Sequence, residues 1–350
     1  MTFCATLSAR MCKAISLAIR CASVKCFPHL PKRSLKKDCA MSDFFRPVKR
    51  MLTIFALLIV SATPCLAGSA LPLHTLEQIA SKKSITLGYQ DDAFPFSWQN
   101  GNVPAGYSID ICNSIVSALK TKLQLKNLKV EWVKANSASQ FVLIKNHMAD
   151  IMCIPAFYSK SRHSISEFSL PFYFSSTRFV MRKNESNDNL AELSGHSVLV
   201  KSGTIYVEQL QKVNAANDLD INIQLDTNNI TAFNELKNGE YSALISSTVL
   251  LKGMIAQTPN PGDYKLSDIA LSAPLPAGLL LPLHDKEFKE FVDGTLSSLM
   301  ASNEFTALYN KWFQSPIPPK AINLNIPMSD NLKALTSAKK KISFDYEKYN

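Results

Sequence analysis

Arg162 is the residue whose chemistry best suits it to hold an anion in this 350-residue sequence. It lies in "SKSRHSISEFSLPFY" (159–173), among small hydroxyl residues and directly before an apolar run that contains proline. A guanidinium group is planar, permanently charged and able to donate two parallel hydrogen bonds to one carboxylate. Arg162 is therefore a candidate carboxylate ligand, and a charge that only faces water is the alternative.

A second group of candidates lies in "KSGT" (201–204), directly before a helical pattern. Ser202 and Thr204 carry hydroxyl groups, and Gly203 allows a ligand to approach the backbone closely. The start of a helix presents unpaired N–H groups and the positive end of the helix dipole, and both favour an anion. An ordinary helix cap is the alternative for this stretch alone. Together with Arg162, it favours a carboxylate site.

Strands and helices must bring these residues together. From Thr75 onward, strand patterns such as "SITLGY" alternate with helical ones, in which Ile111, Ile115 and Leu119 recur at four-residue spacing. The alternation restarts after "STRFVMRK" (176–183) in a second unit of similar size. Strands separated by helices predict an α/β fold of two lobes, each a mostly parallel sheet flanked by helices.

The position of Arg162 in this pattern predicts a cleft. It follows the apolar strand pattern "DIMCIPA" (150–156), so it lies near the carboxyl end of a strand. Loops at such ends converge on a crevice, and two facing lobes form a cleft that can close on a solute. His163 and His196 are isolated from other ligand types, so we expect neither a metal nor a cofactor.

Several stretches, in this order, resemble the extracellular solute-binding proteins of amino-acid ABC transporters. They are "FPFSW", "GYSIDICNSI", "SKSRHSISEFSLPFY", "LSGHSVLVKSGT", "AFNELKNGEYSALIS" and "LYNKWF". The tail "NKWFQSPIPPKAINLNIPMSDNLKAL" is most similar to the glutamate/aspartate-binding branch. The resemblance covers about Thr75 to Leu335. It implies the two-lobed periplasmic binding protein fold (type II), with two hinge strands, and a non-enzymatic monomer that delivers a small carboxylate-bearing solute, an amino acid or analogue, to an inner-membrane ABC permease.

The resemblance also implies roles for single residues. Arg162 matches the arginine that holds the α-carboxylate of the ligand, and Phe96 matches an aromatic that packs on it. We expect Phe94 and Trp98 in the core, and Asp110 at the start of a helix. The full set of expected ligand contacts is Arg162, Thr204, Ser202, Gly203, Phe96, Ala156, Gln90 and Ser247.

The sequence departs from the family where the ligand's ammonium group would bind. The usual aspartate at the end of the strand "SALISS" is replaced by Ser246, Ser247 and Thr248. Leaving a buried ammonium ion without a partner costs several kcal/mol. We therefore expect a carboxylate-bearing solute with a neutral remainder, unless Asp91 or Asp92 replaces the missing partner.

Further departures lie on the other lobe. Arginines of the glutamate/aspartate branch match Gln90 and Gln140 here, and Pro155 in the loop after "DIMC" has no N–H to donate. A periplasmic sensor or divergent receptor is an alternative function. A second alternative is an enzyme similar to cyclohexadienyl dehydratase, with Asp91, Asp92 or Glu167 as its acid.

The formal net charge of +10 belongs mainly to the first 67 residues. Residues 51–64 form a short apolar run behind Arg46, Lys49 and Arg50, which predicts a secretory signal peptide cleaved after Ala67 and a periplasmic location. The remainder has 27 Lys and Arg against 26 Asp and Glu. This balance argues against a nucleic-acid partner, because phosphate binding needs a clustered basic face.

The expected organisation follows from these patterns. We expect a leader and signal peptide at 1–67, the first part of lobe one at 71–177, lobe two at 178–275, a return to lobe one at 276–320 and a surface tail at 321–350. For 1–40, upstream sequence included by an early start is favoured over a transit peptide. Cys112 and Cys153 are expected as two buried thiols, although an oxidising compartment would permit a disulfide.

Overall fold

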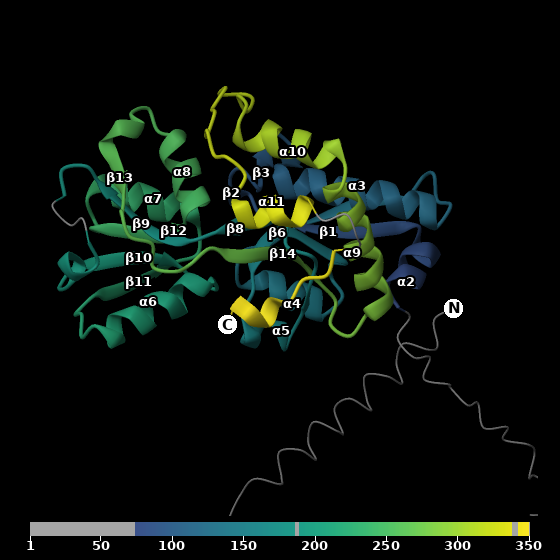
Figure 1. The fold of residues 1–350 in the computed structure, drawn as a ribbon, viewed down its shortest axis with the longest axis horizontal. Helices are drawn as coiled ribbons and strands as arrows, with labels where there is room; N and C mark the ends of the chain where they lie inside the picture. The colour runs from purple at the N-terminus through teal and green to yellow at the C-terminus, as the bar shows by residue number, and fades with distance from the viewer. Residues whose placement is uncertain (1–73, 186–188, 338–341, 350) are drawn as a thin grey trace, which may run out of the picture. The chain divides into compact units, whose positions relative to one another are not determined.

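The computed structural model describes residues 74–185, 189–337 and 342–349. The expected signal peptide at 51–64 lies outside the described residues. Two α/β sheets organise the described chain, and Figure 1 shows them side by side, with β8 and β14 running between them. We call them lobe one and lobe two. Among the described residues, no helix has the length and apolar character needed to cross a bilayer.

Lobe one contains the sheet with strand order β5-β1-β6-β14-β7, in which β8 also pairs with β14. β1 pairs in parallel with β5 and β6, whereas β14 runs antiparallel to β6, β7 and β8. The strands are β1 (Ser84–Tyr89), β5 (Lys129–Lys134), β6 (Ile151–Phe157), β7 (Glu167–Phe168), β8 (Tyr173–Ser175) and β14 (Leu275–Leu281). A small second sheet joins β2 (Asp92–Ala93), β3 (Ser97–Asn100) and β4 (Val103–Ala105).

The helices of the same lobe come from both ends of the described chain. They are α2 (Thr75–Lys82), α3 (Tyr107–Lys122), α4 (Ser139–Lys145), α5 (Lys160–His163), α9 (Lys286–Met300), α10 (Asn303–Phe313) and α11 (Asp330–Thr336), with the short η3 (Tyr346–Tyr349) near the end. The four-residue spacing in α3 has the expected effect, because Ile111, Ile115 and Leu119 are fully buried. α3 contacts both α9 and α10, so residues far apart in sequence share one core.

Lobe two contains the sheet with strand order β11-β10-β12-β9-β13. Its strands are β9 (Thr177–Arg182), β10 (Ser197–Lys201), β11 (Asn222–Asp226), β12 (Ala243–Ser247) and β13 (Tyr264–Leu266). Its helices are α6 (Ile205–Ala216), α7 (Asn229–Asn238) and α8 (Thr248–Ala256), with the short η1 (Ala191–Leu193) and η2 (Pro261–Asp263). Local chemistry sets the ends of α7, since Asn228 accepts from two backbone N–H groups at its start and Gly239, with φ 86°, follows its last residue.

The chain crosses between the lobes twice. It leaves lobe one through β8 and enters lobe two as β9, and it returns through the segment between β13 and β14. β10 pairs in parallel with β11 and β12, whereas β9 is antiparallel to β12 and β13. Both sheets are therefore mixed. Strands that alternate with helices pair in parallel, and the strands next to the crossings, β14 in lobe one and β9 in lobe two, pair antiparallel with their neighbours.

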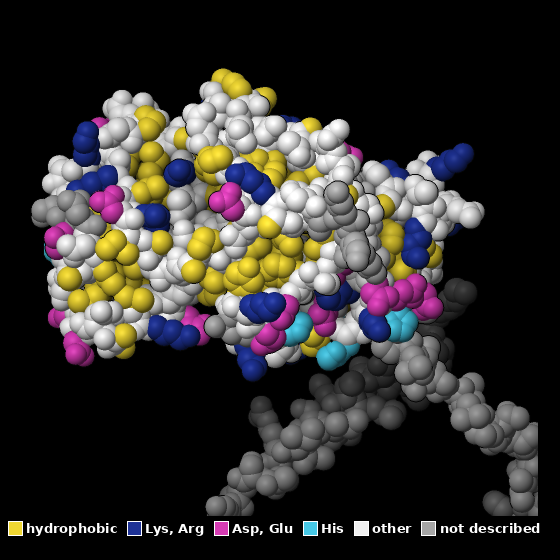
Figure 2. Space-filling view, viewed as in Figure 1, with side chains coloured by type: hydrophobic (Ala, Val, Ile, Leu, Met, Phe, Trp, Pro, Cys, Tyr) yellow, Lys and Arg dark blue, Asp and Glu magenta, His cyan; other side chains and the backbone are white. Residues whose placement is uncertain are grey.

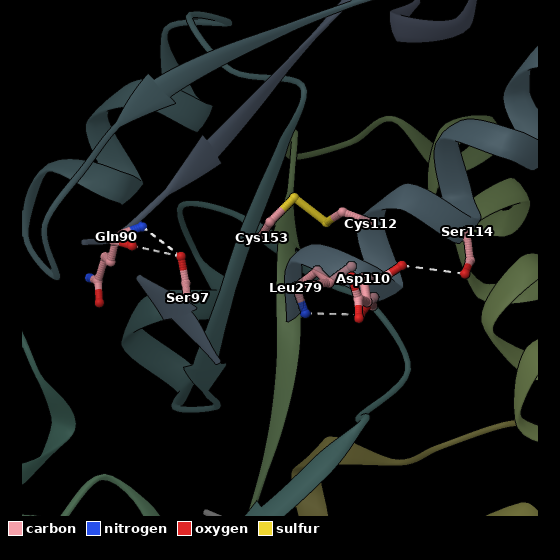
Figure 3. Close-up of a disulfide and its surroundings, with 8 residues drawn as sticks. Gln90, Ser97, Asp110, Cys112, Ser114, Cys153 and Leu279 are labelled. Carbon is pink, nitrogen blue, oxygen red and sulfur yellow. Dashed lines mark hydrogen bonds between the residues drawn. A yellow bond between two sulfur atoms is a disulfide. The ribbon is translucent and has the colours of Figure 1, made fainter. Parts of the chain in front are cut away.

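Cys112 and Cys153 form a disulfide that joins α3 to β6 (Figure 3). Their Cα atoms lie 6.1 Å apart. The expectation of two free thiols was wrong. Each residue alone fits a buried apolar position, and the sequence did not show that α3 packs on β6. The bond fits a protein that folds in an oxidising compartment.

An aromatic cluster fills the core of lobe one beneath α3 and α10. Phe96 and Tyr107 are fully buried there, and their rings contact those of Tyr173 and Phe313. Asp110 on α3 does more than start a helix, since its carboxylate accepts from Lys311 Nζ (2.7 Å) on α10. It also accepts from the Trp312 indole at 2.8 Å, so it ties two helices together.

The last described residues lie against the crossing strands. The Phe344 ring contacts Phe174 of β8, and the Tyr346 hydroxyl donates to the Ser169 carbonyl at 2.6 Å. Figure 2 shows hydrophobic side chains gathered in the middle of this face, with charges of both signs spread around them. On this face the described Lys and Arg side chains are mixed with Asp and Glu.

Candidate functional site

A cavity of about 40 Å³ lies between the two lobes. Lobe one contributes Gln90, Gln140 and Arg162 to its wall, together with residues 154–157 of β6. Lobe two contributes the end of β10, the start of α6, the start of α7 and the end of β12. The volume is room for about three or four water molecules, so the closed site suits a small solute.

Arg162 reaches from α5 across the cleft. Its Nη1 donates to the Phe157 carbonyl of its own lobe at 3.1 Å, and its Nη2 donates to the Gly203 carbonyl of lobe two at 2.9 Å. The guanidinium also lies 5.3 Å from the centre of the Phe141 ring. Burial lowers its pKa to about 10, and the nearby Tyr206 and Glu208 oppose this change. Arg162 therefore stays charged at neutral pH.

The environment of Arg162 lacks a matched anion. None of the described carboxylates forms an ion pair with it, and Glu208 is exposed and pairs with Lys212. The side chain keeps some surface at the cavity, although its surroundings are dense enough to lower its pKa. A partly desolvated cation without a counter-charge favours an anion in the space it faces.

The start of α6 lies opposite Arg162. Thr204 precedes the helix in an extended conformation, and its hydroxyl donates to the Lys201 carbonyl, so it leaves the first N–H groups of α6 uncapped. Gly203 has φ 72°, and a Cβ there would lie 2.7 Å from the Ala138 backbone nitrogen of lobe one. The two lobes thus meet backbone to backbone at this point, which only glycine permits.

Tyr206, in the first turn of α6, forms another part of the wall. Burial raises the pKa of its phenol to about 12, while Ser247, Arg162 and Ser246 offset part of the rise. These serine hydroxyls approach the phenol, although neither Oγ atom makes a hydrogen bond of acceptable geometry. Tyr206 also contacts the Phe157 ring of lobe one, with ring centres 6.0 Å apart, so this neutral phenol closes one side of the cavity.

A buried ion pair joins the lobes beside the cavity. Lys201 Nζ at the end of β10 donates to Asp92 Oδ2 at 2.6 Å, and their side chains are only 3% and 4% exposed. The same oxygen accepts from the Asn229 backbone N–H at 2.8 Å, at the start of α7. The Asn229 side-chain amide donates to the Asp92 carbonyl at 3.0 Å. We call the set of Asp92, Lys201 and Asn229 the interlobe latch.

Two glutamines give the lobe-one wall its polarity. Gln90 Nε2 donates to the Ser137 hydroxyl at 3.3 Å, and the Gln90 backbone is held by Ser97, as Figure 3 shows. Gln140 Nε2 donates to the Ser137 carbonyl at 2.9 Å. This bond fixes the orientation of the amide, and Gln140 Oε1 is left buried without a hydrogen-bond partner.

Most of the expected ligand residues come together. Arg162, Gly203, Thr204, Gln90 and Ala156 all line the cavity. The other three expected residues, Phe96, Ser202 and Ser247, are not part of its wall.

These three residues have other surroundings. Phe96 is fully buried in the aromatic core, where its apolar ring is stabilised by neighbouring rings. Ser202 extends β10, and its N–H donates to the Asp226 carbonyl at 2.7 Å. Ser247 lies beside Tyr206, while its neighbour Ser246 lines the cavity. As ligand contacts, Phe96, Ser202 and Ser247 therefore stay predictions, and the wall of the described cavity does not include them.

Sequence reasoning missed several wall residues. Lys201 stands first in "KSGT", and its place at the end of a buried strand was the available signal. Tyr206 and Asn229 lie in the first turns of helices, where side chains and N–H groups meet a cleft. Asp91 forms an ion pair with Lys134, and Asp92 belongs to the latch. Both aspartates that could replace the missing partner of an ammonium group are therefore paired with a lysine in this structure.

Residues 74–185, 189–337 and 342–349 contain no cluster of three or more His, Cys, Asp or Glu side chains that could hold a metal. The described side chains around the cavity offer hydrogen bonds and positive charge. The fold and the cavity together define a two-lobed protein that binds a small solute between its lobes.

The comparisons with known proteins agree with this class. Residues 85–315 match the bacterial extracellular solute-binding proteins, family 3, and the chain belongs to this family. It is 32% identical over 266 residues to the L-glutamate/L-aspartate-binding protein of Pseudomonas aeruginosa, covering 75% of this chain and 88% of the relative. It is 30% identical over 291 residues to the glutamate/aspartate import solute-binding protein of Escherichia coli (strain K12), covering 82% and 96%.

Solved structures support the fold. An ancestral amino acid-binding protein, described as a precursor of cyclohexadienyl dehydratase, aligns with a TM-score of 0.60 at 19% identity. The alignment covers 69% of this chain and 99% of that chain. A solute receptor for L-cysteine of Neisseria gonorrhoeae aligns with a TM-score of 0.60 at 20% identity, covering 68% and 92%. The expected family and the type II fold are confirmed.

Proposed function

We propose that this protein binds a small carboxylate-bearing solute between its lobes, with Arg162 as the anchor of the carboxylate. The observation that carries the proposal is a charged guanidinium that faces an interlobe cavity without an acidic partner among the described residues. The opposite wall is the uncapped start of α6, which favours an anion for the same electrostatic reason.

Binding works through hinge closure. Arg162 belongs to lobe one and the first N–H groups of α6 belong to lobe two, so one carboxylate can bond both lobes at once. A ligand that bonds both lobes has more contacts in the closed state than in the open one, and this difference shifts the population toward closure. In the described part of the chain, β8–β9 and the segment before β14 connect the lobes, and two such connections can serve as a hinge.

The proposed setting is uptake from outside the cytoplasmic membrane. The family is extracellular, and relatives are named for the import of glutamate and aspartate. We therefore place the protein, as a monomer exported by a cleaved signal peptide, in the periplasm, where it hands its solute to an inner-membrane ABC permease. The Cys112–Cys153 disulfide supports export.

Binding without catalysis is the better supported activity. An enzyme on this scaffold needs an acid in the cleft. The three acids expected from the sequence are engaged or displaced: Asp91 pairs with Lys134, Asp92 pairs with Lys201, and Glu167 lies on β7, away from the cavity wall. The curated relatives named above are binding proteins.

Calorimetry on the purified protein tests the anchor. The titrants are a panel of amino acids and small organic acids, and the variant is Arg162→Met, which removes the charge at similar length. Two hydrogen bonds to a charged group contribute about 3 kcal/mol together, so we expect affinity to fall about 100-fold. The matched control is Arg182→Met on β9, whose partners are the Leu236 and Tyr241 carbonyls and Glu185, all in lobe two.

The two variants and the wild type distinguish the possible outcomes. Loss of binding in Arg162→Met with binding kept in Arg182→Met supports the anchor. Equal affinity in the wild type and Arg162→Met contradicts it, and the conversion of any titrant by the wild type would reassign the protein to an enzyme class.

A further inference from the structure

The wall of the cavity, as far as the structure describes it, carries positive charge. Among the described residues that line it, Arg162 and Lys201 are the charged ones, and none is Asp or Glu. Asp92 neutralises Lys201 from behind the wall, with both side chains almost fully buried. The site therefore presents one uncompensated cation to a solute, and it matches a solute with a single negative charge.

An ammonium group on the solute would meet unfavourable surroundings. Arg162 repels it, Lys201 is already paired with Asp92, and an ion in a desolvated site needs a counter-charge. Asp92, which pairs with a residue of the wall, already accepts from Lys201 and from the Asn229 N–H through the same oxygen. Giving that carboxylate to an ammonium group would leave the buried lysine without its partner.

The neutral polar groups of the wall point to an uncharged donor instead. Gln140 lines the cavity, and its Oε1 is buried and has no partner, while the Nε2 of the same amide is held by the Ser137 carbonyl. It is an acceptor only, so it calls for a donor on the solute. Ser246 Oγ on the opposite wall makes no hydrogen bond of acceptable geometry, and it can donate or accept.

The interlobe latch limits the length of the solute. Asn229 and Leu250 line both the cavity and a second hollow of about 170 Å³, which Asp92, Phe94 and Trp98 also line. We therefore expect a longer solute that extends toward that hollow to disturb the Asp92–Lys201 pair.

We propose that the site takes a small organic acid with one carboxylate and an uncharged hydrogen-bond donor, of the 2-hydroxy acid type, in preference to the matching α-amino acid. Arg162 holds the carboxylate, Gln140 Oε1 accepts from the hydroxyl group, and the Asp92–Lys201 pair excludes a second charge. This rests on the proposed function, since it assigns a solute class to the same anchor.

The test is calorimetric titration of the purified protein with matched pairs that differ only in the amino or hydroxyl group. The probes are L-alanine with L-lactate, L-leucine with L-2-hydroxyisocaproate, and L-glutamate with L-2-hydroxyglutarate. In the pair that binds most tightly, we expect the hydroxy acid to bind at least 10-fold more tightly than the amino acid. An amino acid that binds equally or more tightly in that pair overturns the inference.

Variants at Ser246 test whether a carboxylate added to the wall restores a preference for the amino acid. Ser246→Asp adds a carboxylate to the wall, so the preference should shift at least 10-fold toward the amino acid. Ser246→Asn has the same shape without the charge, and its preference should stay with the hydroxy acid. An equal shift in both variants overturns the inference. Thermal unfolding checks that each variant folds, and Gln140→Glu supplies the carboxylate from the other wall if Ser246→Asp does not.

Failure of the inference and failure of the proposed function give different results. If an amino acid binds more tightly and Arg162→Met abolishes that binding, the solute class is wrong and the anchor stands. If none of the six probes binds to the wild type, the solute class is wrong. If the probes bind equally to the wild type and Arg162→Met, the anchor is wrong, and the proposed function fails together with the inference that rests on it.

Discussion

Breaking the interlobe latch should open the protein rather than unfold it. Lys201→Met leaves the Asp92 carboxylate buried in the closed state with only the Asn229 N–H as a charge-stabilising partner. Removing one partner of a buried ion pair costs about 3 to 5 kcal/mol. Opening of the cleft returns Asp92 to water, so the cost falls on closure and reduces the closed-to-open ratio by about 100-fold or more.

Two measurements follow this change. Small-angle X-ray scattering of the ligand-free protein should show a larger radius of gyration for Lys201→Met than for the wild type. The affinity for the solute should fall by a similar factor of about 100, because the binding-competent state becomes rarer. The denaturant midpoint should change much less, since opening relieves the strain before either lobe unfolds.

The double variant and a surface control sharpen the test. Asp92→Asn combined with Lys201→Met removes both charges, so it should recover part of the lost affinity. Lys212→Met breaks the exposed ion pair with Glu208, which is worth less than about 1 kcal/mol, and should change neither measurement. Unchanged scattering and affinity in Lys201→Met would refute the reasoning.

Three further predictions concern pH and the disulfide. Burial lowers the pKa of Arg162 to about 10; solute affinity should therefore be constant across neutral pH and fall as pH rises through 10, measured by calorimetry. For Asp285, burial raises the pKa, but hydrogen bonds from Thr75 and from the Phe288 N–H, with the nearby His74, outweigh this, so the pKa lies below its usual value. This carboxylate stabilises the fold above its unfolded-state pKa, and the stability lost in Asp285→Asn should shrink in denaturant titrations as pH falls through that pKa toward the lower folded-state pKa; a loss independent of pH would contradict this. Reduction of the Cys112–Cys153 disulfide should cost about 2 to 5 kcal/mol in the same titrations, and an unchanged midpoint would contradict it.

The fold was predictable because its signals are local. Alternating strand and helix patterns predicted two α/β lobes, and the period of α3 predicted its buried face. Arg162 and "KSGT" were predictable for the same reason, since each follows a strand and the ends of strands meet at the cleft. The structure adds the reason for a glycine at 203, because its positive φ and the close approach of Ala138 admit no side chain.

What the sequence could not provide was the pairing of distant residues. Asp92 and Lys201 are 109 positions apart, and nothing near either residue indicates a buried ion pair. Phe96 illustrates the same limit. An aromatic next to a cleft can face the solute or the core, and here the rings of Tyr107, Tyr173 and Phe313 hold it in the core. The disulfide likewise depended on the contact between α3 and β6.

A crystal structure of the protein with the solute it carries tests the central claim most directly. The account predicts one carboxylate within about 3 Å of the Arg162 guanidinium and of the first N–H groups of α6, with an uncharged donor facing Gln140. A solute bound outside the interlobe cavity, or one whose carboxylate does not contact Arg162, would contradict it.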